Sequence, residues 1–333
     1  MKEPLRFAVY DIGSNSVKFL VAEARAAGQP PLVLAEESHT TRLAEDLIAT
    51  CELKQEAIDR TLASLKEMAG KAARLGVPPN APGSVHSRAV ATSAVRDSRN
   101  RKAFLKEAAV ALGFPVTLLS GEEEAEGVYR GIRSGGHRTT FEEGDLLAVD
   151  VGGGSAEWIL GAGGKIARRV SLPLGCVRLR ERFIPGYPVP QGALDAMAQS
   201  LEEQLAPILA DYARERRDRP VVGTGGTITA AAAIALKLPD YDPSKVHLHV
   251  LTRETIACEL NRFAALDADS LRHVTGLPPK RADILVPGLA VFLATLKLLE
   301  ASRLTVSVRG LRYGVLDGLI AEAAPASSAT EGK

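Results

Sequence analysis

Two short turns of this sequence carry the residue types that bind phosphate oxygens. Residues 11–16 (Asp-Ile-Gly-Ser-Asn-Ser) and 150–155 (Asp-Val-Gly-Gly-Gly-Ser) share the order Asp, apolar residue, Gly, two residues, Ser. Glycine-rich turns expose backbone N–H groups to a concave point, and such nests bind anions. A single glycine-rich turn would most simply be an ordinary hairpin turn. This sequence has three, the third at residues 223–227 (Gly-Thr-Gly-Gly-Thr), and their number favours phosphate binding. The candidates in the two matching turns are Gly13, Ser14, Asn15, Ser16, Gly152, Gly153, Gly154 and Ser155.

The aspartates that lead these turns have two readings. Asp11 and Asp150 each end an apolar run and point into a turn. Carboxylates there can hold Mg²⁺ beside phosphate oxygens. They can equally accept hydrogen bonds from the N–H groups of the turn itself.

A cluster of acids follows Ser120, in the order Ser-Gly-Glu-Glu-Glu-Ala. Ser120 and Glu123 have the spacing of a capping box, which predicts a helix start. Three adjacent carboxylates also repel one another, and one that faced a cleft would have the raised pKa of a general base. The residues alone leave both readings open.

Basic residues occur in two places that could contact an anion. Arg96 follows an apolar run and could bind phosphate bidentately or form a surface ion pair. Residues 165–182 contain six basic residues and one acid, Glu181. Such a run is usually a solvated face, but it could also be a track for a long polyanion.

The sequence lacks the motifs of several other kinds of binding site and catalytic site. The sequence has neither a Walker A motif nor GxGxxG nor GxSxG. The histidines form no metal-ligand pattern, and the cysteines, Cys51, Cys176 and Cys258, are far apart with no CxxC spacing. We therefore expect neither a zinc site nor covalent catalysis.

The bulk properties indicate an ordinary globular protein. The 333 residues are 46% apolar and 24% charged, and 41 basic against 40 acidic residues give a formal charge of +1. No global field favours nucleic acid, so an anion must be held by local charges. We see no signal peptide and no apolar stretch of membrane-spanning length, and we expect a cytoplasmic protein with no membrane partner.

The elements that would position the turns repeat along the chain. Residues 7–10 and 17–22 predict a hairpin around the first turn, and residues 146–149 and 158–160 predict a hairpin around the second. Alternating helices and strands follow each, with helices expected at 52–76, 98–112, 191–217, 227–237, 253–265 and 281–300. Strands are expected at 85–92, 116–119, 220–222 and 304–308. The pattern predicts an α/β fold with duplicated lobes and a disordered tail at 324–333.

Seven segments resemble one family, in the family's order and over nearly the whole chain. They are AVYDIGSNSVKFLVAE (8–23), RAVATSAVRDSRN (88–100), LLSGEEEAEGVYRGI (118–132), LLAVDVGGGSAEWILG (146–161), VGTGGTITA (222–230), KRADILVPGL (280–289) and VSVRGLRYGVL (306–316). The chain resembles the exopolyphosphatase/guanosine pentaphosphate phosphatase (Ppx/GppA) family. That family belongs to the actin–hexokinase–Hsp70 superfamily of duplicated ribonuclease-H-like lobes with a central cleft.

The resemblance implies roles for particular residues. Glu123 would be the base that activates water, and Asp150 and Glu157 would coordinate Mg²⁺ or water. Arg96 and Arg281 would contact the phosphate chain. Lys18 stands at a position that is basic in some members, and the two glycine turns would hold phosphates from opposite lobes.

The resemblance also implies an architecture and a reaction. Lobe I would span 1–125 and be completed by the helix 311–323, and lobe II would span 126–310. The reaction would be removal of the terminal phosphate of inorganic polyphosphate by water, with Mg²⁺ or Mn²⁺ as cofactor and Asp11, Asp150 and Glu157 as metal candidates. A guanosine pentaphosphate 5′-phosphatase, a non-catalytic phosphate or nucleotide sensor and, more remotely, a sugar kinase are the alternatives. A homodimer is left open.

The chain departs from the family pattern in two places. Tyr313 stands where the closing element usually has Glu, which puts that residue's polar contact in doubt. The chain ends after the second lobe, whereas longer members add a helical domain, so we expect no substrate channel extended by such a domain.

Overall fold

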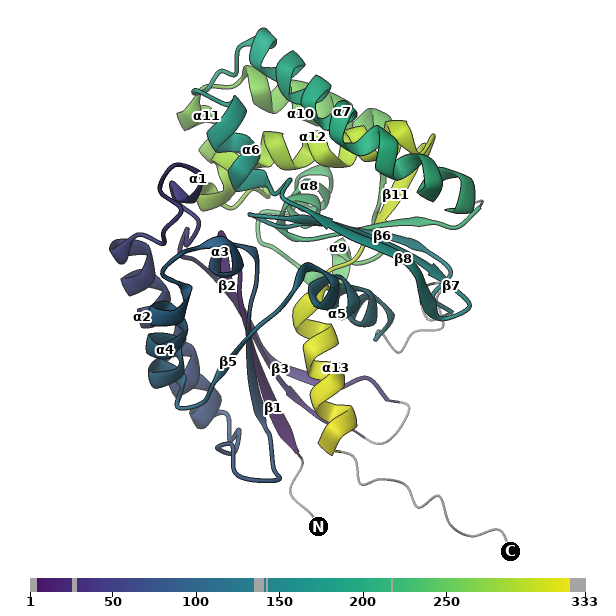
Figure 1. Ribbon diagram of the computed structural model, residues 1–333. Coiled ribbons are helices and arrows are strands. Elements are labelled where there is room, and N and C mark those ends of the chain that lie inside the picture. The colour runs from purple at the N-terminus through teal and green to yellow at the C-terminus, as the bar shows by residue number, and fades with distance from the viewer. Residues whose placement is uncertain (1–4, 26–28, 135–140, 142, 217, 324–333) are drawn as a thin grey trace, which may run out of the picture.

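The computed structural model describes residues 5–25, 29–134, 141, 143–216 and 218–323. The predicted disordered tail, 324–333, lies outside the described residues. Two α/β lobes stack on each other with a cleft between them (Figure 1).

Lobe I is built on a five-stranded sheet with the order β3-β2-β1-β4-β5. Its strands are β1 (Arg6–Ile12), β2 (Ser16–Glu23), β3 (Leu32–Thr40), β4 (Ser87–Ala91) and β5 (Val116–Leu118). The first three strands form an antiparallel meander, and β4 and β5 continue the sheet in parallel with β1.

Lobe II repeats this arrangement in a six-stranded sheet with the order β10-β11-β9-β6-β7-β8. Its strands are β6 (Leu147–Val151), β7 (Ala156–Ala162), β8 (Lys165–Leu172), β9 (Val221–Thr224), β10 (Val250–Thr252) and β11 (Arg303–Val306). Strands β6 to β8 form the meander, and β9 and β11 add in parallel. The shared order confirms the predicted duplication of ribonuclease-H-like lobes, with β10 as an antiparallel addition at the edge.

Helices cover both faces of each sheet. They are α1 (Leu47–Thr50), α2 (Gln55–Arg74), α3 (Ser93–Asp97), α4 (Arg101–Leu112), α5 (Gly121–Arg133), α6 (Cys176–Phe183), α7 (Gln191–Arg216), α8 (Gly226–Ala235), α9 (Pro243–Val246), α10 (Arg253–Ala265), α11 (Ala268–Arg272), α12 (Ala282–Leu298) and α13 (Leu311–Ala323), with a 3₁₀ turn at Pro279–Arg281. Strands buried on both faces read as continuous apolar runs, which explains β1 and β6.

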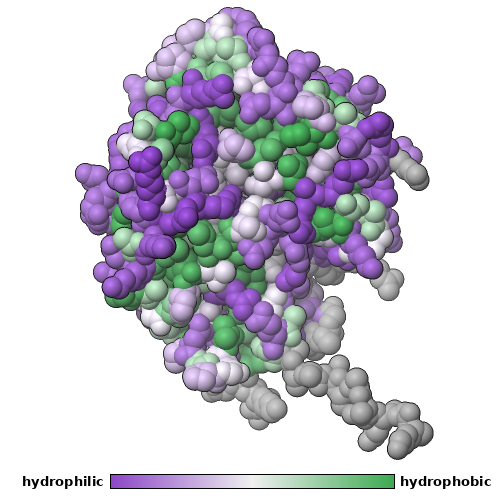
Figure 2. Space-filling model, viewed as in Figure 1, coloured by the Kyte–Doolittle hydropathy of each residue, from purple (hydrophilic) through white to green (hydrophobic). Residues whose placement is uncertain are grey.

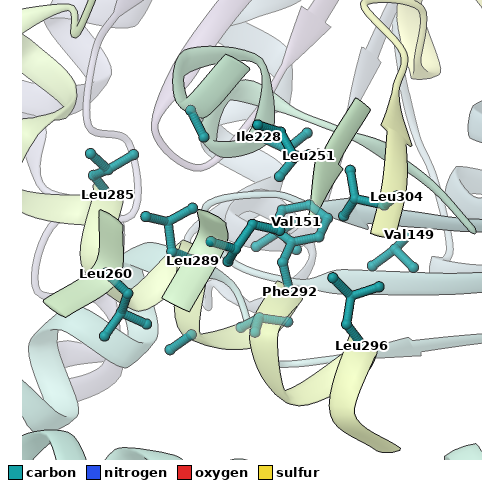
Figure 3. Close-up of a cluster of buried hydrophobic side chains, with 14 of the residues drawn as sticks. Val149, Val151, Ile228, Leu251, Leu260, Leu285, Leu289, Phe292, Leu296 and Leu304 are labelled. Carbon is teal, nitrogen blue, oxygen red and sulfur yellow. The ribbon is translucent and has the colours of Figure 1, made fainter. Parts of the chain in front are cut away.

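The core of lobe II lies between its sheet and the long helix α12. Figure 3 shows Val151 of β6 beside Leu289 and Phe292 of α12, and Val149 nearer to Leu296 of the same helix. The opposite face of β6, through Ala148, packs in a separate cluster with the buried residues of α5. Lobe I has the same two-sided arrangement, with Tyr10 facing the α2 and α4 side and Val9 facing α13.

Helices α5 and α13 join the lobes. Helix α5 packs on β7 and β8 of lobe II, and α13, the last helix, packs back on β1 and β2 of lobe I (Figure 1). They cross where a Cβ on Gly131 would collide with the backbone of Gly310, so glycine permits this close approach. The predicted lobe boundary after residue 125 falls inside α5, which we therefore treat as part of the joint between the lobes.

Hydrophilic side chains cover most of the face shown in Figure 2, with hydrophobic patches scattered among them. Among the described helices, none combines the length and the apolar character needed to cross a bilayer.

Candidate active site

The two matching turns have the same backbone geometry. Gly13 N–H donates to the Ser16 carbonyl at 3.1 Å, and Gly152 N–H donates to the Ser155 carbonyl at 3.0 Å. Each turn therefore closes over four residues between paired strands, as the hairpin prediction requires.

Each turn is also held from behind by the segment that follows the third strand of its lobe. Ala44 N–H donates to the Ser14 carbonyl at 2.9 Å, and Cys176 N–H donates to the Gly152 carbonyl at 2.9 Å. The N–H groups of residues 14, 15, 153 and 154 donate to no group in the described part of the chain. Carbonyls bound from behind and free N–H groups in front make a nest suited to phosphate oxygens.

The turns approach each other across the cleft between the lobes. A Cβ on Gly153 would lie 2.9 Å from Ser14 Cβ, and one on Gly154 would lie 2.5 Å from Ser14 Oγ. The two glycines of lobe II thus leave room for the larger side chains of the lobe I turn.

The cleft gathers most of the predicted site residues. Its lining includes Asp11, Gly13, Ser14, Asn15, Ser16, Lys18, Asp150, Gly152, Gly153, Gly154, Ser155 and Arg281. Residues that the sequence did not single out also line it, namely Thr92, Glu124, Cys176, Ile284 and Leu311. Glu123, Arg96 and Glu157 are not among the lining residues.

Asp11 and Asp150 lie on the floor of the cleft. Lys18, which pairs with Asp11 across the β1–β2 ladder, places its Nζ 3.9 Å from Asp11 Oδ2. Burial raises the pKa of both aspartates, and the charge of Lys18 counteracts this. Gly225, at φ +95°, gives Asp150 its space, because a Cβ there would lie 2.6 Å from Asp150 Oδ1.

Glu123 is turned away from the cleft by its own helix cap. Its carboxylate accepts from Ser120 N–H at 2.7 Å, while Glu123 N–H donates to Ser120 Oγ at 3.2 Å. This confirms the capping box, and the bond from the Ser120 backbone lowers the pKa of Glu123. The base at Glu123 stays a prediction, but this geometry does not favour it, since an exposed carboxylate with a lowered pKa is a poor proton acceptor at neutral pH.

The next residue, Glu124, enters the cleft instead. Its side chain is buried, and Arg96 Nη1 lies 3.2 Å from its Oε2. Arg96 also donates to the Leu119 carbonyl at 2.9 Å, so the predicted phosphate ligand here holds a carboxylate. Burial raises the pKa of Glu124 to about 7, against the opposing charge of Arg96.

The sequence did contain a signal for Glu124. The buried face of α5 includes Val128 and Ile132, and stepping back by four residues from Val128 gives Glu124. Glu123 lies off this face.

Glu157 lies behind the cleft. It pairs with Asp150 in the β6–β7 ladder, is 1% exposed, and accepts from Ser171 Oγ at 2.7 Å. Burial and then the negative charges of Glu124 and Asp150 raise its pKa well above the usual range. The carboxyl groups of Glu124, Asp150 and Glu157 are therefore close enough to influence one another's protonation.

Arg281 lies at the start of α12, and its Nη2 is 3.4 Å from Ser16 Oγ. Among the described residues, no carboxylate lies within ion-pair distance of it. Burial lowers its pKa. A guanidinium that reaches the lobe I turn without an acid partner is placed to bind an anion.

The predicted metal ligands are the three acids Asp11, Asp150 and Glu157. No group of three or more His, Cys, Asp or Glu side chains within the described ranges is arranged to hold a metal ion. Asp11, Asp150 and Glu157 therefore do not form a direct three-ligand site. Two cleft carboxylates with raised pKa values still fit a divalent cation that takes its other ligands from phosphate and water.

Half of the six basic residues in the run 165–182 are paired with acids, namely Arg168, Arg169 and Arg178. Residues 165–172 form β8, in which Arg168 binds Glu215 at 2.7 Å and Arg169 binds Glu122 at 2.9 Å. Arg178 donates to the Gly154 carbonyl at 2.8 Å and pairs with Asp97 of lobe I. These three arginines are held by contacts within lobe II, to α5 and to lobe I, and the track for a long polyanion stays a prediction.

Comparison with known proteins agrees with this geometry. The profile of the Ppx/GppA phosphatase family matches residues 20–323. The chain belongs to this family. The resemblance inferred from its motifs is therefore confirmed, as is the superfamily fold.

Individual relatives cover nearly all of this chain. A crystal structure of the Aquifex aeolicus Ppx/GppA family member is 29% identical, covers 97% of this chain and 99% of that one, and has a TM-score of 0.77. An exopolyphosphatase from Cytophaga hutchinsonii is 26% identical, with coverage of 95% and 98% and a TM-score of 0.83.

A curated relative, a bifunctional 3-dehydroquinate synthase/phosphatase of Fusobacterium nucleatum, is 28% identical over 323 residues. The match covers 94% of this chain and 46% of that protein, so this chain spans about half the length of that relative.

Proposed function

We propose that this protein hydrolyses the terminal phosphate of a phosphoanhydride chain, with inorganic polyphosphate as its substrate. The observation that carries the proposal is Glu124, a buried carboxylate held by Arg96 at a cleft between two phosphate-binding turns. Family membership supports a phosphatase reaction.

In this proposal the terminal phosphate binds between the two turns. Their free N–H groups and Arg281 hold its oxygens, and negative charge that develops on them in the transition state is stabilised by these fixed donors. Phosphoryl transfer needs mainly positioning and charge neutralisation, which this cleft offers without a covalent nucleophile.

Glu124 accepts the proton of the attacking water. A new P–O bond forms to that water oxygen, and the bond from phosphorus to the bridging oxygen breaks, leaving a chain shorter by one phosphate. A pKa of about 7 leaves much of Glu124 ionised near neutral pH, yet basic enough to accept a proton. Arg96 orients the carboxylate.

A divalent cation fits the charge balance of the cleft. Four carboxyl groups, Asp11, Glu124, Asp150 and Glu157, face three cations, Lys18, Arg96 and Arg281, before any phosphate enters. Asp11 and Asp150 would hold Mg²⁺ or Mn²⁺ together with substrate oxygens and water. When bound, the ion would neutralise charge on the phosphate oxygens.

The proposal is tested by orthophosphate release from long polyphosphate, tripolyphosphate and guanosine pentaphosphate, each with Mg²⁺, Mn²⁺ or excess EDTA. We expect release from polyphosphate that requires a divalent cation. A preference for guanosine pentaphosphate would favour the 5′-phosphatase alternative, and binding without release from any substrate would leave a sensor. Full activity in EDTA would refute the metal proposal.

A further inference from the structure

The cleft continues past the two turns into a wider compartment. The space at the turns is about 60 Å³, and the compartment beyond it is about 290 Å³. The two spaces share a floor that includes Asp11, Lys18, Asp150 and Arg281. A phosphate chain whose end lies between the turns has this adjoining compartment available for its next groups.

The part of the compartment that is not shared has a distinct lining. Among the described residues that line only this part, Arg312 is the sole charged side chain. The hydroxyl groups there belong to Ser38, Thr40, Thr224, Thr229 and Tyr241. Thr224 and Thr229 donate to backbone carbonyls. The other three hydroxyls and one guanidinium are a set of donors that suits phosphate oxygens.

Arg312 is held in place by a side chain of lobe I. Its Nη2 pairs with Oε1 of Glu36 on β3, and its side chain is 14% exposed. Glu36 does not line the compartment, so Arg312 stands between that carboxylate and the cleft. A guanidinium has five N–H donors, and one carboxylate leaves others for a ligand.

Tyr313 completes the support. Its hydroxyl donates to Glu36 Oε2 at 2.7 Å, while its ring lies 5.7 Å from the Arg312 guanidinium. Tyr313 stands where the family pattern usually has Glu, and a second carboxylate beside Glu36 would repel it. A tyrosine at position 313 therefore fits the carboxylate of Glu36, to which it donates a hydrogen bond.

We infer that Arg312, positioned by Glu36 and Tyr313, forms a further phosphate subsite that binds the internal phosphates of the substrate chain. The inference rests on the proposed function, because it takes the terminal phosphate to lie between the turns. Arg281 lines both spaces and would bridge the terminal and internal phosphates. Substrate preference would then depend on chain length, since pyrophosphate lacks phosphates that reach Arg312.

Two variants of Arg312 and a matched control test the subsite. Arg312→Ala removes the cation, and Arg312→Lys keeps the charge but loses the planar pair of donors. Arg309→Ala is the control, because Arg309 also lies over the Tyr313 ring, at 5.1 Å, but donates to the Ser134 carbonyl and does not line the compartment. Melting temperatures check that each variant folds.

For Arg312→Ala we expect the KM for tripolyphosphate and longer chains to rise roughly tenfold to 100-fold, as for a lost charge-assisted hydrogen bond, with kcat nearly unchanged. Arg312→Lys should show a smaller rise, and pyrophosphate hydrolysis should change little in either variant. Arg309→Ala should match the wild type on every substrate. Tyr313→Phe, which keeps the ring, should raise the KM for long chains a few-fold.

Equal KM changes on pyrophosphate and on longer chains, or no change in Arg312→Ala, would overturn the subsite. Calorimetric binding of tripolyphosphate separates this failure from failure of the proposed function. If the wild type binds tripolyphosphate but releases no orthophosphate from any substrate, the proposed function fails. The subsite still stands or falls on whether Arg312→Ala weakens that binding.

Discussion

The β1–β2 hairpin of lobe I and the β6–β7 hairpin of lobe II share a backbone but differ in charge. Both turns close with the same Gly-to-Ser hydrogen bond, and both begin with an aspartate at the same register position. The residue opposite that aspartate is Lys18 in lobe I and Glu157 in lobe II. The two hairpins thus share the phosphate nest, while one cross-strand position carries a cation in lobe I and a carboxyl group in lobe II.

The difference between Lys18 and Glu157 suggests that the two hairpins have different roles in binding and in catalysis. Lys18 partly neutralises Asp11, which favours binding of an anion on the lobe I side. On the lobe II side, burial and then the charges of Glu124 and Asp150 raise the pKa of Glu157, so this side holds protons rather than anions. We therefore expect a substitution of Lys18 to act mainly on KM and a substitution of Glu157 to act mainly on kcat.

The largest expected effect comes from the two neighbouring glutamates of α5. Glu124→Gln should lower kcat about 10²- to 10⁴-fold, the usual cost of losing a general base. Glu123→Gln should keep near-normal kcat, because Gln also serves at that position of a capping box. Steady-state kinetics on tripolyphosphate checks both variants.

The two variants control for each other, since each replaces one carboxylate by an amide one residue apart. Tripolyphosphate should still bind Glu124→Gln in a calorimeter. A large loss of kcat in a folded Glu123→Gln variant, with Glu124→Gln active, would return the base to Glu123.

The next effect separates the two hairpins at their matched positions. Lys18→Gln should raise the KM for tripolyphosphate roughly tenfold or more, because a charged partner of phosphate is lost. Glu157→Gln should instead lower kcat about tenfold, because this buried carboxyl group lies beside Glu124 and Asp150 and is bound by Ser171 behind the cleft. Measuring KM and kcat for both variants shows which hairpin acts on binding and which acts on turnover. If both variants changed the same parameter, the hairpins would not differ in role.

The smallest effect concerns the ion pair that links the lobe II turn, through Arg178, to α3 of lobe I. Asp97→Asn removes the partner of Arg178, and both side chains are partly exposed, so we expect less than about a fivefold rise in KM. Asp211→Asn, at a surface ion pair with Arg214 away from the cleft, is the control. The Asp97 effect should shrink at 1 M salt because exposed charges are screened. A rise in KM that salt leaves unchanged would argue against an electrostatic contact.

Much of this fold could be predicted because its strands follow the apolar pattern. The hairpins around the two turns and the helix at 253–265 were predicted close to their observed bounds, since buried elements leave a clear periodic signal. The third strand of each lobe, β3 and β8, was missed. Both carry many polar or charged side chains and are only half-buried, so their pattern resembles a solvated segment.

The site was predicted better for backbone than for side chains. Glycine-rich turns can be recognised from the sequence, and the structure brings both of them to one cleft. The position of Glu124, by contrast, depends on which face of α5 packs inward, and the capping box drew attention to Glu123. Arg312 and Glu36 are 276 residues apart, so their pairing required the folded chain.

The dependence of kcat on pH tests the central claim most directly, because Glu123 and Glu124 have opposite pKa shifts. The base acts when ionised, so kcat must fall as pH drops through its pKa. For Glu124 we expect an acid limb with a midpoint near pH 7, measured at saturating tripolyphosphate and Mg²⁺, kept in Glu123→Gln and lost in the residual activity of Glu124→Gln. A limb below the ordinary glutamate value of 4.5, where the lowered pKa of Glu123 lies, would contradict the assignment of Glu124 as the base.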